Sequence, residues 1–582
     1  MAININWYMP FFADDSLITL RYAQRLIDGY GLTWTDGIKV EGYSNLLWVL
    51  ILAFFGKLGA NMMLVARILG ILFTLTNIYL LIDYAKKKYT TAPKILLIVL
   101  FLFSTSAIVA VWAIGGLENS LVSLLALISI TRYLEYQNTN DTRYLWFSSV
   151  SLGLLSITRP DGVLLSVIIG LFHLISNRND LKIAFTNLSK IALFPIILYF
   201  GQLTFRILYY GELVPNTAHV KVSPSLYHAY TGIMYTLRFF KSNFSLFLIA
   251  FGSLGYLIYK KKQIALLYMM LIGIWAAYIA FIGGDFFFAF RHHLFTIIVF
   301  MLLIIDGMGI YLEQNNFKPK KKKVWISLLS LLMLFYLYQQ ITDDNNTRSR
   351  KSLWVFNLKT LGKELKNTFG EKQPLIAIDP AGSLPYFTMF PALDMLGLND
   401  YHIPRNKPEN MGKGFIGHEL GDPEYVLNNE PDIIQFHIGT REPILNIDTM
   451  LSENIRFQNR YIDVAIYVKG EYDYKGVLYF DKYSKKVGID SSFAKLEIPS
   501  YLFKSETEIF NIFEGNKLVA PLETDISVSF VVPYEINPTL IRTIPSGLDV
   551  VSSKNRTTKL TKLTITNASK NRVNFEKVVI LQ

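Results

Sequence analysis

The sequence predicts a polytopic α-helical membrane protein with a folded C-terminal half outside the bilayer. Of its 582 residues, 52% are hydrophobic, and the mean hydropathy is +0.32. Up to about residue 340 the apolar residues form long blocks, whereas beyond it they alternate with polar residues, as in an ordinary folded domain. The net charge of +12 comes from short basic runs between the apolar blocks. That pattern is typical of membrane-protein loops and argues against a nucleic-acid-binding surface.

Ten segments are candidates for spanning helices, which need about 20 mostly apolar residues. They begin near residues 64, 95, 119, 143, 162, 183, 243, 264, 289 and 324. The fourth and fifth are short and flank Arg159-Pro160-Asp161-Gly162, so they form either a tight helical hairpin or one broken helix. Residues 1–13 are too short to span. We expect a preceding helix to be absent from this chain, rather than an N-terminus that inserts outside, so the full count is 10–11 spans.

The loops between alternating spans fall into two sets of very different charge. One set carries seventeen lysines and arginines, whereas the other carries five, namely Arg159, Lys221, Arg238, Lys241 and Arg291. Because positively charged loops stay in the cytoplasm, the second set is predicted to lie outside. The external set comprises residues 1–62, the turn at 115–118, the loop at 210–242, the segment 283–293 and everything after residue 341.

The predicted domains follow from these patterns. Residues 1–62 form an external loop, residues 63–340 form the transmembrane core, residues 341–488 form an external α/β domain, and residues 489–582 form an external β-sandwich. Buried strands at 375–379 and 432–437 alternate with helical stretches in the α/β domain. Short alternating runs at 526–532, 560–565 and 573–581 predict the β-sandwich, which either binds glycan or braces the membrane half.

The external N-terminal loop contains two predicted interfacial helices. The first begins with Asp14 and Asp15 and carries an apolar stripe suited to the membrane surface. The second, Leu46–Leu52, follows Glu41-Gly42-Tyr43-Ser44-Asn45 and is too short to cross the bilayer. A purely structural interpretation of the acids is that Asp14 caps the first helix and Asp15 favours its positive end.

Several motifs in order resemble one family. They include Asp14-Asp15-x-x-Ile18-x-Leu20-Arg21-Tyr22-Ala23, Val40-Glu41-Gly42-Tyr43-Ser44-Asn45, Gly116-Leu117-Glu118, Arg159-Pro160-Asp161-Gly162, Tyr210-Gly211-Glu212-x-x-Pro215-Asn216-Thr217 and Gly283-Gly284-Asp285 with Arg291. Motifs at 379–386, 394–398 and 417–422 continue the match, which covers about residues 12–500. The chain resembles the GT-C glycosyltransferases and is most similar to the terminal arabinofuranosyltransferases of mycobacterial cell walls.

The resemblance implies transfer of a sugar from a polyprenyl phosphate to an acceptor hydroxyl, with inversion. The sugar is an arabinofuranose-like pentose or a hexose. A carboxylate takes the acceptor proton, and cationic side chains stabilise the departing phosphate. By resemblance, Asp14 is the base, and Asp15 and Glu41 orient the acceptor or tune Asp14. The implied donor-phosphate and substrate residues are Arg21, Lys39, Arg159, Asp161, Asn216, Lys221, Asp285, Arg291 and His292.

Each of these residues also has a structural interpretation. The cations could contact lipid headgroups or snorkel, and Arg159 could simply pair with Asp161. No cofactor is expected to be required. A divalent metal stays open, because Asp285, His219 and His292 could meet in space. The absence of cysteine excludes thiolate chemistry and cysteine metal ligands. The string Gly412–Gly417 satisfies G-x-G-x-x-G, but it does not follow a strand and is assigned to a loop.

The expected partners are a polyprenyl-phosphate-linked sugar, a glycan or lipid acceptor of the cell envelope and membrane lipid, with no nucleic acid. The expected location is the bacterial inner membrane, with the active site and C-terminal domain facing the periplasm or exterior. The main competing function is that of a transporter or flippase of lipid-linked glycans, although such proteins place polar groups at the midplane and often show internal repeats. A non-enzymatic scaffold and a transferase that moves a phosphosugar are two less favoured functions.

Overall fold

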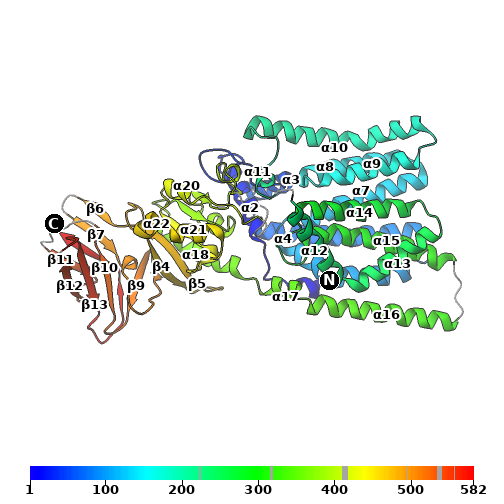
Figure 1. The fold of residues 1–582 in the computed structure, drawn as a ribbon. Coiled ribbons are helices and arrows are strands. Elements are labelled where there is room, and N and C mark those ends of the chain that lie inside the picture. The colour runs from blue at the N-terminus through cyan, green and yellow to red at the C-terminus, as the bar shows by residue number, and fades with distance from the viewer. Residues whose placement is uncertain are drawn as a thin grey trace. The chain divides into compact units, whose positions relative to one another are not determined.

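A computed structural model describes residues 1–221, 225–314, 319–408, 417–492, 495–533, 540–555 and 557–581. The string Gly412–Gly417 therefore lies outside the described residues except for Gly417. The described chain forms two compact units (Figure 1). The helical unit contains Met1–Thr33 and Lys39–Ser352, and the second unit contains Trp34–Ile38, Leu353–Glu409 and Gly417–Gln582.

The helical unit contains a helix or a helix pair at each of the ten predicted segments. These are α4 (Met62–Lys88), α5 (Ala92–Thr105) with α6 (Ala107–Ile114), α7 (Asn119–Thr139), α8 (Arg143–Thr158), α9 (Gly162–Ser176), α10 (Leu181–Tyr210), α12 (Leu226–Ser242) with α13 (Phe244–Tyr259), α14 (Ile264–Ile282), α15 (Leu294–Gln314) and α16 (Pro319–Thr342). The short helices α1 (Ala2–Trp7), α2 (Asp14–Ile27), α3 (Leu46–Lys57), α11 (Asn216–Lys221), η1 (Arg291–His293) and α17 (Asp344–Lys351) complete it.

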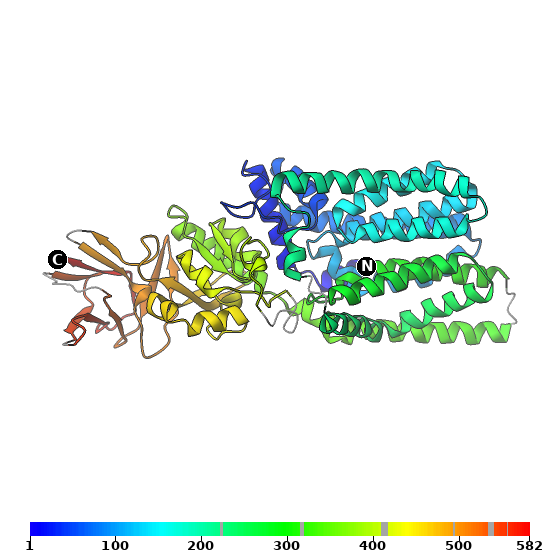
Figure 2. The same cartoon turned by 45° about the horizontal axis from the view of Figure 1, so that its top comes forward.

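Within the described part of the chain, five helices are long and apolar enough to cross a membrane, or up to seven if each bent pair counts as one span. The pairs bend by 56° between α5 and α6 and by 93° between α12 and α13. The ten predicted segments also included α7, which has 21 residues but is not among these helices. They included α8 and α9 as well, which have 16 and 15 residues and are shorter than the usual crossing of about 20 residues. These two helices pack against each other (Figure 1 and Figure 2), as expected for a helical hairpin.

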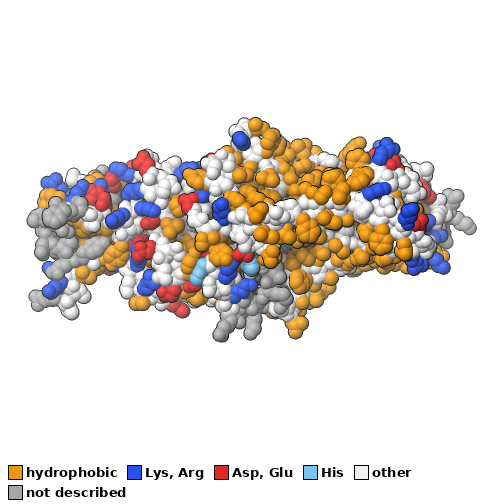
Figure 3. Space-filling view, turned by 90° about the horizontal axis from the view of Figure 1, so that it is seen from above, with side chains coloured by type: hydrophobic (Ala, Val, Ile, Leu, Met, Phe, Trp, Pro, Cys, Tyr) orange, Lys and Arg blue, Asp and Glu red, His pale blue; other side chains and the backbone are white. Residues whose placement is uncertain are grey.

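The surface of the helical unit is that of a membrane protein. Hydrophobic side chains cover its side, and lysines and arginines gather toward its end (Figure 3). Many of the large apolar residues on α10 and α16 are exposed, among them Leu208 at 82% and Leu331 at 64%. Exposed apolar surface of this extent is stable in lipid, where no water has to solvate it. The predicted class, a polytopic helical membrane protein, is confirmed.

The second unit contains α18 (Trp354–Phe369) and a mixed sheet of order β2-β1-β3-β5-β4. The parallel strands are β1 (Ile376–Ile378), β2 (Ala392–Asp394) and β3 (Ile433–Gln435), and the antiparallel strands are β4 (Tyr461–Val468) and β5 (Tyr474–Asp481). Between them lie α19 (Ser383–Thr388), η2 (Ile403–Arg405), α20 (Pro423–Asn428), η3 (His437–Gly439), α21 (Asn446–Glu453) and α22 (Ile455–Arg460). Ala377, Ile434 and Phe436 belong to the core of this region.

The C-terminal region is built from antiparallel sheets of orders β11-β15-β7-β6, β10-β13-β12 and β14-β9-β8. Its elements are β6 (Asp490–Ser492), β7 (Lys495–Pro499), η4 (Ser500–Leu502), β8 (Ile512–Glu514), β9 (Lys517–Leu522), β10 (Ser527–Val531), β11 (Leu540–Ile544), β12 (Asp549–Lys554), β13 (Thr561–Thr566), β14 (Val573–Phe575) and β15 (Lys577–Leu581). The three predicted strand runs coincide with β10, β13 and the β14–β15 pair. Side chains of β13 alternate between buried and less buried positions, as the period of two requires.

Candidate active site

The start of α2 is anchored to the turn that follows α6. The backbone N–H of Ala13 and the hydroxyl of Ser16 both donate to the carbonyl of Gly115, at 3.0 and 2.7 Å. The indole N–H of Trp48 on α3 donates to the carbonyl of Gly116 at 3.0 Å. Both helices are therefore held on one turn of the helical unit, and the acidic start of α2 has a fixed position.

Asp14 and Asp15 occupy the first turn of α2. The N-cap residue is Ala13, whose side chain makes no capping hydrogen bond. The interpretation in which Asp14 caps α2 is therefore wrong, because the helix begins one residue too early for Asp14 to be its cap. Asp14 is 7% exposed, whereas the side chain of Asp15 is 22% exposed. Two carboxylates in the first helical turn interact favourably with the helix dipole.

Asp15 belongs to a charge cluster of four residues. The Lys221 ammonium lies 3.8 Å from Asp15 Oδ2, and the Arg291 guanidinium lies 3.6 Å from the same oxygen. Arg291 is also paired with Asp285, at 2.7 Å between Nε and Oδ2 and 3.1 Å between Nη2 and Oδ1. The cluster joins α2, the end of α11 and the segment between α14 and α15, and all three lie in the loops predicted to be external.

Aromatic rings hold the Arg291 side chain. Its guanidinium carbon lies 4.6 Å from the ring centre of Phe287 and 5.9 Å from that of Trp112. The indole N–H of Trp112 donates to the carbonyl of Ala289 at 3.0 Å. Ala289 and Phe290 have positive φ angles of 52° and 43°, an uncommon and strained conformation for residues with a side chain. The backbone is therefore strained at the position that directs Arg291 toward Asp15.

Glu41 is held by a different arginine. It is buried and ion-paired with Arg206 of α10, whose Nη2 lies 3.3 Å from Oε1. The carbonyl of Glu41 accepts from the backbone N–H of Asn216 at 3.0 Å, and Asn216 is itself buried. Burial raises the pKa of Glu41, while hydrogen bonds from Arg206 act in the opposite direction. This pair positions α11, whose last residue is Lys221.

Arg159 and Asp161 form a buried polar network. The Arg159 guanidinium donates to Asp161 at 3.0 Å and to Glu118 at 2.9 Å. Glu118 also accepts from the Asn45 amide at 2.7 Å, and Tyr278 of α14 donates to Asp161 at 3.1 Å. Arg159 therefore has two carboxylate partners, which agrees with the structural interpretation of this residue. The network ties the turn between α8 and α9 to the loop before α3.

The remaining predicted residues are dispersed. Arg21 is fully buried within α2. Lys39 is exposed, and its ammonium lies 4.2 Å from the ring centre of Tyr209. His292 is 8% exposed, and its carbonyl accepts from the indole of Trp275 at 2.8 Å. His219 faces Glu212 at 3.7 Å. In the described residues, no three or more His, Asp or Glu side chains are grouped so that they could hold a metal ion, so Asp285, His219 and His292 do not form such a group.

Arg206 and the aromatic residues around Arg291 were not predicted as part of the site. Arg206 lies near the end of a predicted span, and a basic residue inside an apolar helix is itself a signal of function. Trp112 and Phe287 carried no such signal, because aromatic residues are common in membrane helices and at their ends. Their role is visible only when the chain is folded.

Comparisons with known proteins agree with this architecture. A family model described as a domain of unknown function (DUF8728) matches residues 341–484. No curated protein matches the chain. Among solved structures, the chain is similar to ArnT from Cupriavidus metallidurans in the apo state, with 10% identity, a TM-score of 0.53 and coverage of 82% of this chain and 96% of that one. It is similarly related to the same ArnT bound to undecaprenyl phosphate, with 10% identity, a TM-score of 0.50 and coverage of 68% and 84%.

These similarities show the fold. The chain has a GT-C-like fold, a polytopic helical membrane part followed by a C-terminal region that contains β-sheets, and this part of the prediction is confirmed. The arabinofuranosyltransferase subtype stays a prediction.

Proposed function

We propose that this protein is an inverting glycosyltransferase that takes its sugar from a polyprenyl phosphate. The observation that carries the proposal is the charge cluster, in which two cations, Lys221 and Arg291, face a carboxylate at the start of an interfacial helix. A lipid phosphate lies at the membrane surface, where this cluster sits by the predicted topology. ArnT, which shares the fold, has been solved with undecaprenyl phosphate bound.

The reaction requires two kinds of protein group, a carboxylate base and cations that stabilise the leaving phosphate. The acceptor oxygen attacks the anomeric carbon, the bond from that carbon to the phosphate oxygen breaks, and polyprenyl phosphate leaves with the bonding electrons. Lys221 and Arg291 stabilise the charge that develops on the phosphate. A carboxylate accepts the proton that the acceptor hydroxyl loses. No general acid is needed, because phosphate is a good leaving group.

Inversion distinguishes the roles of the two aspartates. The acceptor attacks from the face of the sugar opposite the departing phosphate, so the base and the phosphate-binding cations stand on opposite sides of the anomeric carbon. Asp15 contacts both cations and is therefore on the phosphate side. Asp14, the adjacent residue of the first helical turn, is the better candidate for the base. Before the donor binds, the Asp15 carboxylate neutralises the charge of the two cations, and the donor phosphate then takes the place of Asp15 as their partner.

The donor assignment predicts transfer without a nucleotide sugar. Purified protein in liposomes should transfer sugar from an added polyprenyl-phosphate sugar to a glycan or lipid acceptor, with the product identified by mass. The pentose and hexose donors should be tested in parallel, because an arabinofuranose-like sugar is proposed by resemblance alone. Strict dependence on a nucleotide sugar would contradict the proposal. Movement of the lipid-linked sugar across the bilayer without a new glycosidic bond would favour a flippase instead.

The proposed location predicts an external C-terminus. The charge difference between the two sets of loops supports a second unit outside the cytoplasm of a bacterial inner membrane. A reporter that is active only after export, fused behind Gln582, should be active, and a reporter that works only in the cytoplasm should be silent at the same position. The reverse pattern would put the charge cluster on the cytoplasmic side and remove the basis of the proposed site.

A further inference from the structure

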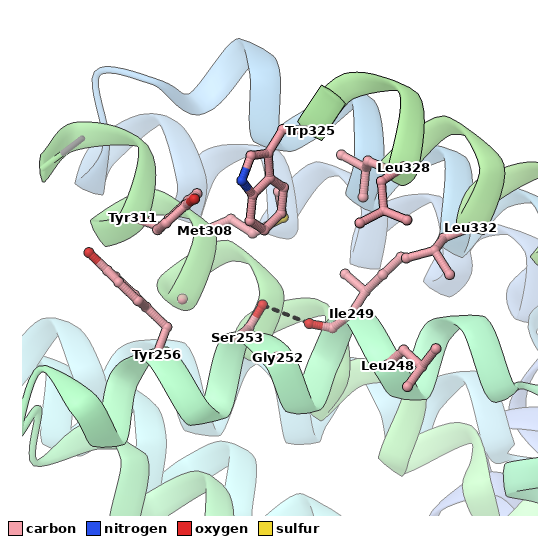
Figure 4. Close-up of a pocket in the computed structure, with 12 residues that line it drawn as sticks. Leu248, Ile249, Gly252, Ser253, Tyr256, Met308, Tyr311, Trp325, Leu328 and Leu332 are labelled. Atoms are coloured by element: carbon pink, nitrogen blue, oxygen red, sulfur yellow. Dashed lines mark hydrogen bonds between the residues drawn. The ribbon is translucent and has the colours of Figure 1, made fainter. Parts of the chain in front are cut away.

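A groove of about 440 Å³ opens between α13, α15 and α16. Figure 4 shows the aromatic side chains of Tyr256, Tyr311 and Trp325 toward one end of it and Leu332 toward the other. The Ser253 hydroxyl in the lining already donates to the carbonyl of Ile249, at 2.9 Å. The lining is therefore mostly carbon, and its other polar side-chain groups are those of Tyr256, Tyr311 and Trp325.

The groove exists because α16 stands away from a tightly packed helix pair. A Cβ atom on Gly307 of α15 would lie 2.5 Å from Cβ of Ser253, so α13 and α15 are in close contact at this point. By contrast, only 11% of the apolar window of α16 is buried. Leu328 of α16, which lines the groove, is 52% exposed. The space is open along α16 and not enclosed within the bundle.

The aromatic end of the groove has the composition of a membrane interface. The rings of Tyr256 and Tyr311 are 5.0 Å apart, and those of Tyr311 and Trp325 are 5.2 Å apart. Tyrosine and tryptophan are enriched at the level of lipid headgroups. This end of the groove therefore marks where a headgroup would lie.

A basic residue lies at the same end, where the Lys260 ammonium is 5.6 Å from the ring centre of Tyr256. Lys260–Lys262 follow Tyr256 at the end of α13, and Lys323 precedes Trp325 on α16; all four are exposed. The nearby acid on α15, Glu313, accepts from the backbone N–H and the hydroxyl of Thr90, at 2.8 and 3.1 Å. The four lysines outnumber Glu313, so these residues together carry a net positive charge. A negatively charged lipid headgroup complements this charge.

We propose that this groove binds one acyl chain of an anionic phospholipid, with the headgroup on Lys260–Lys262 and Lys323. A group the size of a water molecule occupies about 30 Å³. The groove volume of about 440 Å³ therefore holds about fifteen groups of this size, about as many as the carbon groups of one acyl chain. Each basic residue near a membrane surface strengthens binding of anionic lipid by about fivefold. A zwitterionic lipid fits the groove equally well but gains nothing from the lysines. The bound chain would fill the space beside α16 and brace that helix.

Two glycines of α13 provide a matched pair of variants. Gly252 lines the groove, and a Cβ atom there would meet nothing within 4 Å, so the Cβ of Gly252→Leu has room and its side chain takes up space in the groove. Gly255 is equally open and exposed but is not among the lining residues, so Gly255→Leu adds the same side chain elsewhere. A third variant, Lys260→Gln/Lys261→Gln/Lys262→Gln, changes only exposed side chains.

The test is native mass spectrometry of the full chain, purified in mild detergent, with equal amounts of phosphatidylglycerol, phosphatidylcholine and a polyprenyl phosphate added. Wild-type protein and Gly255→Leu should retain phosphatidylglycerol in preference to phosphatidylcholine. Gly252→Leu should retain at least fivefold less of it. The triple lysine variant should lose at least tenfold of the preference over phosphatidylcholine, and phosphatidylglycerol should raise its Tm less than it raises that of wild type.

Three results would overturn the proposal. The first is equal retention of phosphatidylglycerol and phosphatidylcholine by wild-type protein. The second is an equal loss in both glycine variants, which would mean that the groove is not the site. The third is loss of polyprenyl phosphate, and not of phosphatidylglycerol, in Gly252→Leu, which would assign the groove to the tail of the donor. If Gly252→Leu does not express, the lysine variant and its Tm shift decide the question.

Discussion

Asp14→Asn should lower the rate of sugar transfer by about 10²–10⁴-fold, the usual cost of losing a general base. Asparagine keeps the size of the side chain and its hydrogen-bonding capacity but cannot accept the acceptor proton. Because Ala13, and not Asp14, is the N-cap of α2, the substitution does not remove the cap of this helix. The lost interaction with the helix dipole is worth only about 0.3–1 kcal/mol. The variant should therefore express, insert and bind the lipid donor normally.

Two further variants serve as controls for Asp14. Asp15→Asn should affect transfer less, because this carboxylate faces Lys221 and Arg291, the two cations proposed to bind the departing phosphate. Glu41→Gln should weaken the pairing with Arg206 and reduce the amount of folded protein more than the chemical step. Normal turnover in Asp14→Asn together with none in Glu41→Gln would make Glu41 the base. Normal turnover in both variants would mean that the loop is structural and that the enzymatic proposal fails.

The local features of the fold were predictable from the sequence. The apolar blocks placed the helices, and the acidic pair placed the start of α2 at Asp14, because hydrophobic periodicity and charge near a helix start depend on neighbouring residues. The short segment Trp34–Ile38 belongs to the second unit, although it lies inside the predicted external loop. The N–H of Ala392 donates to the Thr35 hydroxyl at 3.2 Å, a contact that no local pattern encodes.

Ion pairs between side chains could be predicted from the sequence only in part. Arg159 and Asp161 are two residues apart, so a simple ion pair between them was evident from the sequence. The partner of Glu41 lies 165 residues away, on α10, and neither periodicity nor spacing connects the two. The family resemblance implied that Asp15, Lys221, Asp285 and Arg291 are site residues. Their meeting in one cluster depends on how the strained segment at Ala289 and Phe290 turns Arg291 toward α2.

Arg291→Gln should lower transfer by about 10²–10³-fold, the cost of removing one group that stabilises developing negative charge. The guanidinium is 8% exposed at its side chain and is fixed between Asp285 and the ring of Phe287, so it is aimed before the donor binds. The affinity for the lipid phosphate should fall as well, since the arginine meets the phosphate in the ground state too. Arg238→Gln removes the same charge from an exposed position on α12 and should leave transfer unchanged.

The difficulty with Arg291→Gln is that it leaves the Asp285 carboxylate without its ion-pair partner, and an uncompensated buried charge costs about 3–5 kcal/mol of folding stability. The double variant Arg291→Gln/Asp285→Asn removes both charges and keeps two amides that can hydrogen-bond. The double variant should fold better than the single variant. Its rate of transfer should be as low as that of the single variant, because the phosphate still lacks the Arg291 guanidinium. Recovery of transfer in the double variant would show that Arg291 acts only by neutralising Asp285. In that case the phosphate would be bound by Lys221 without help from the arginine.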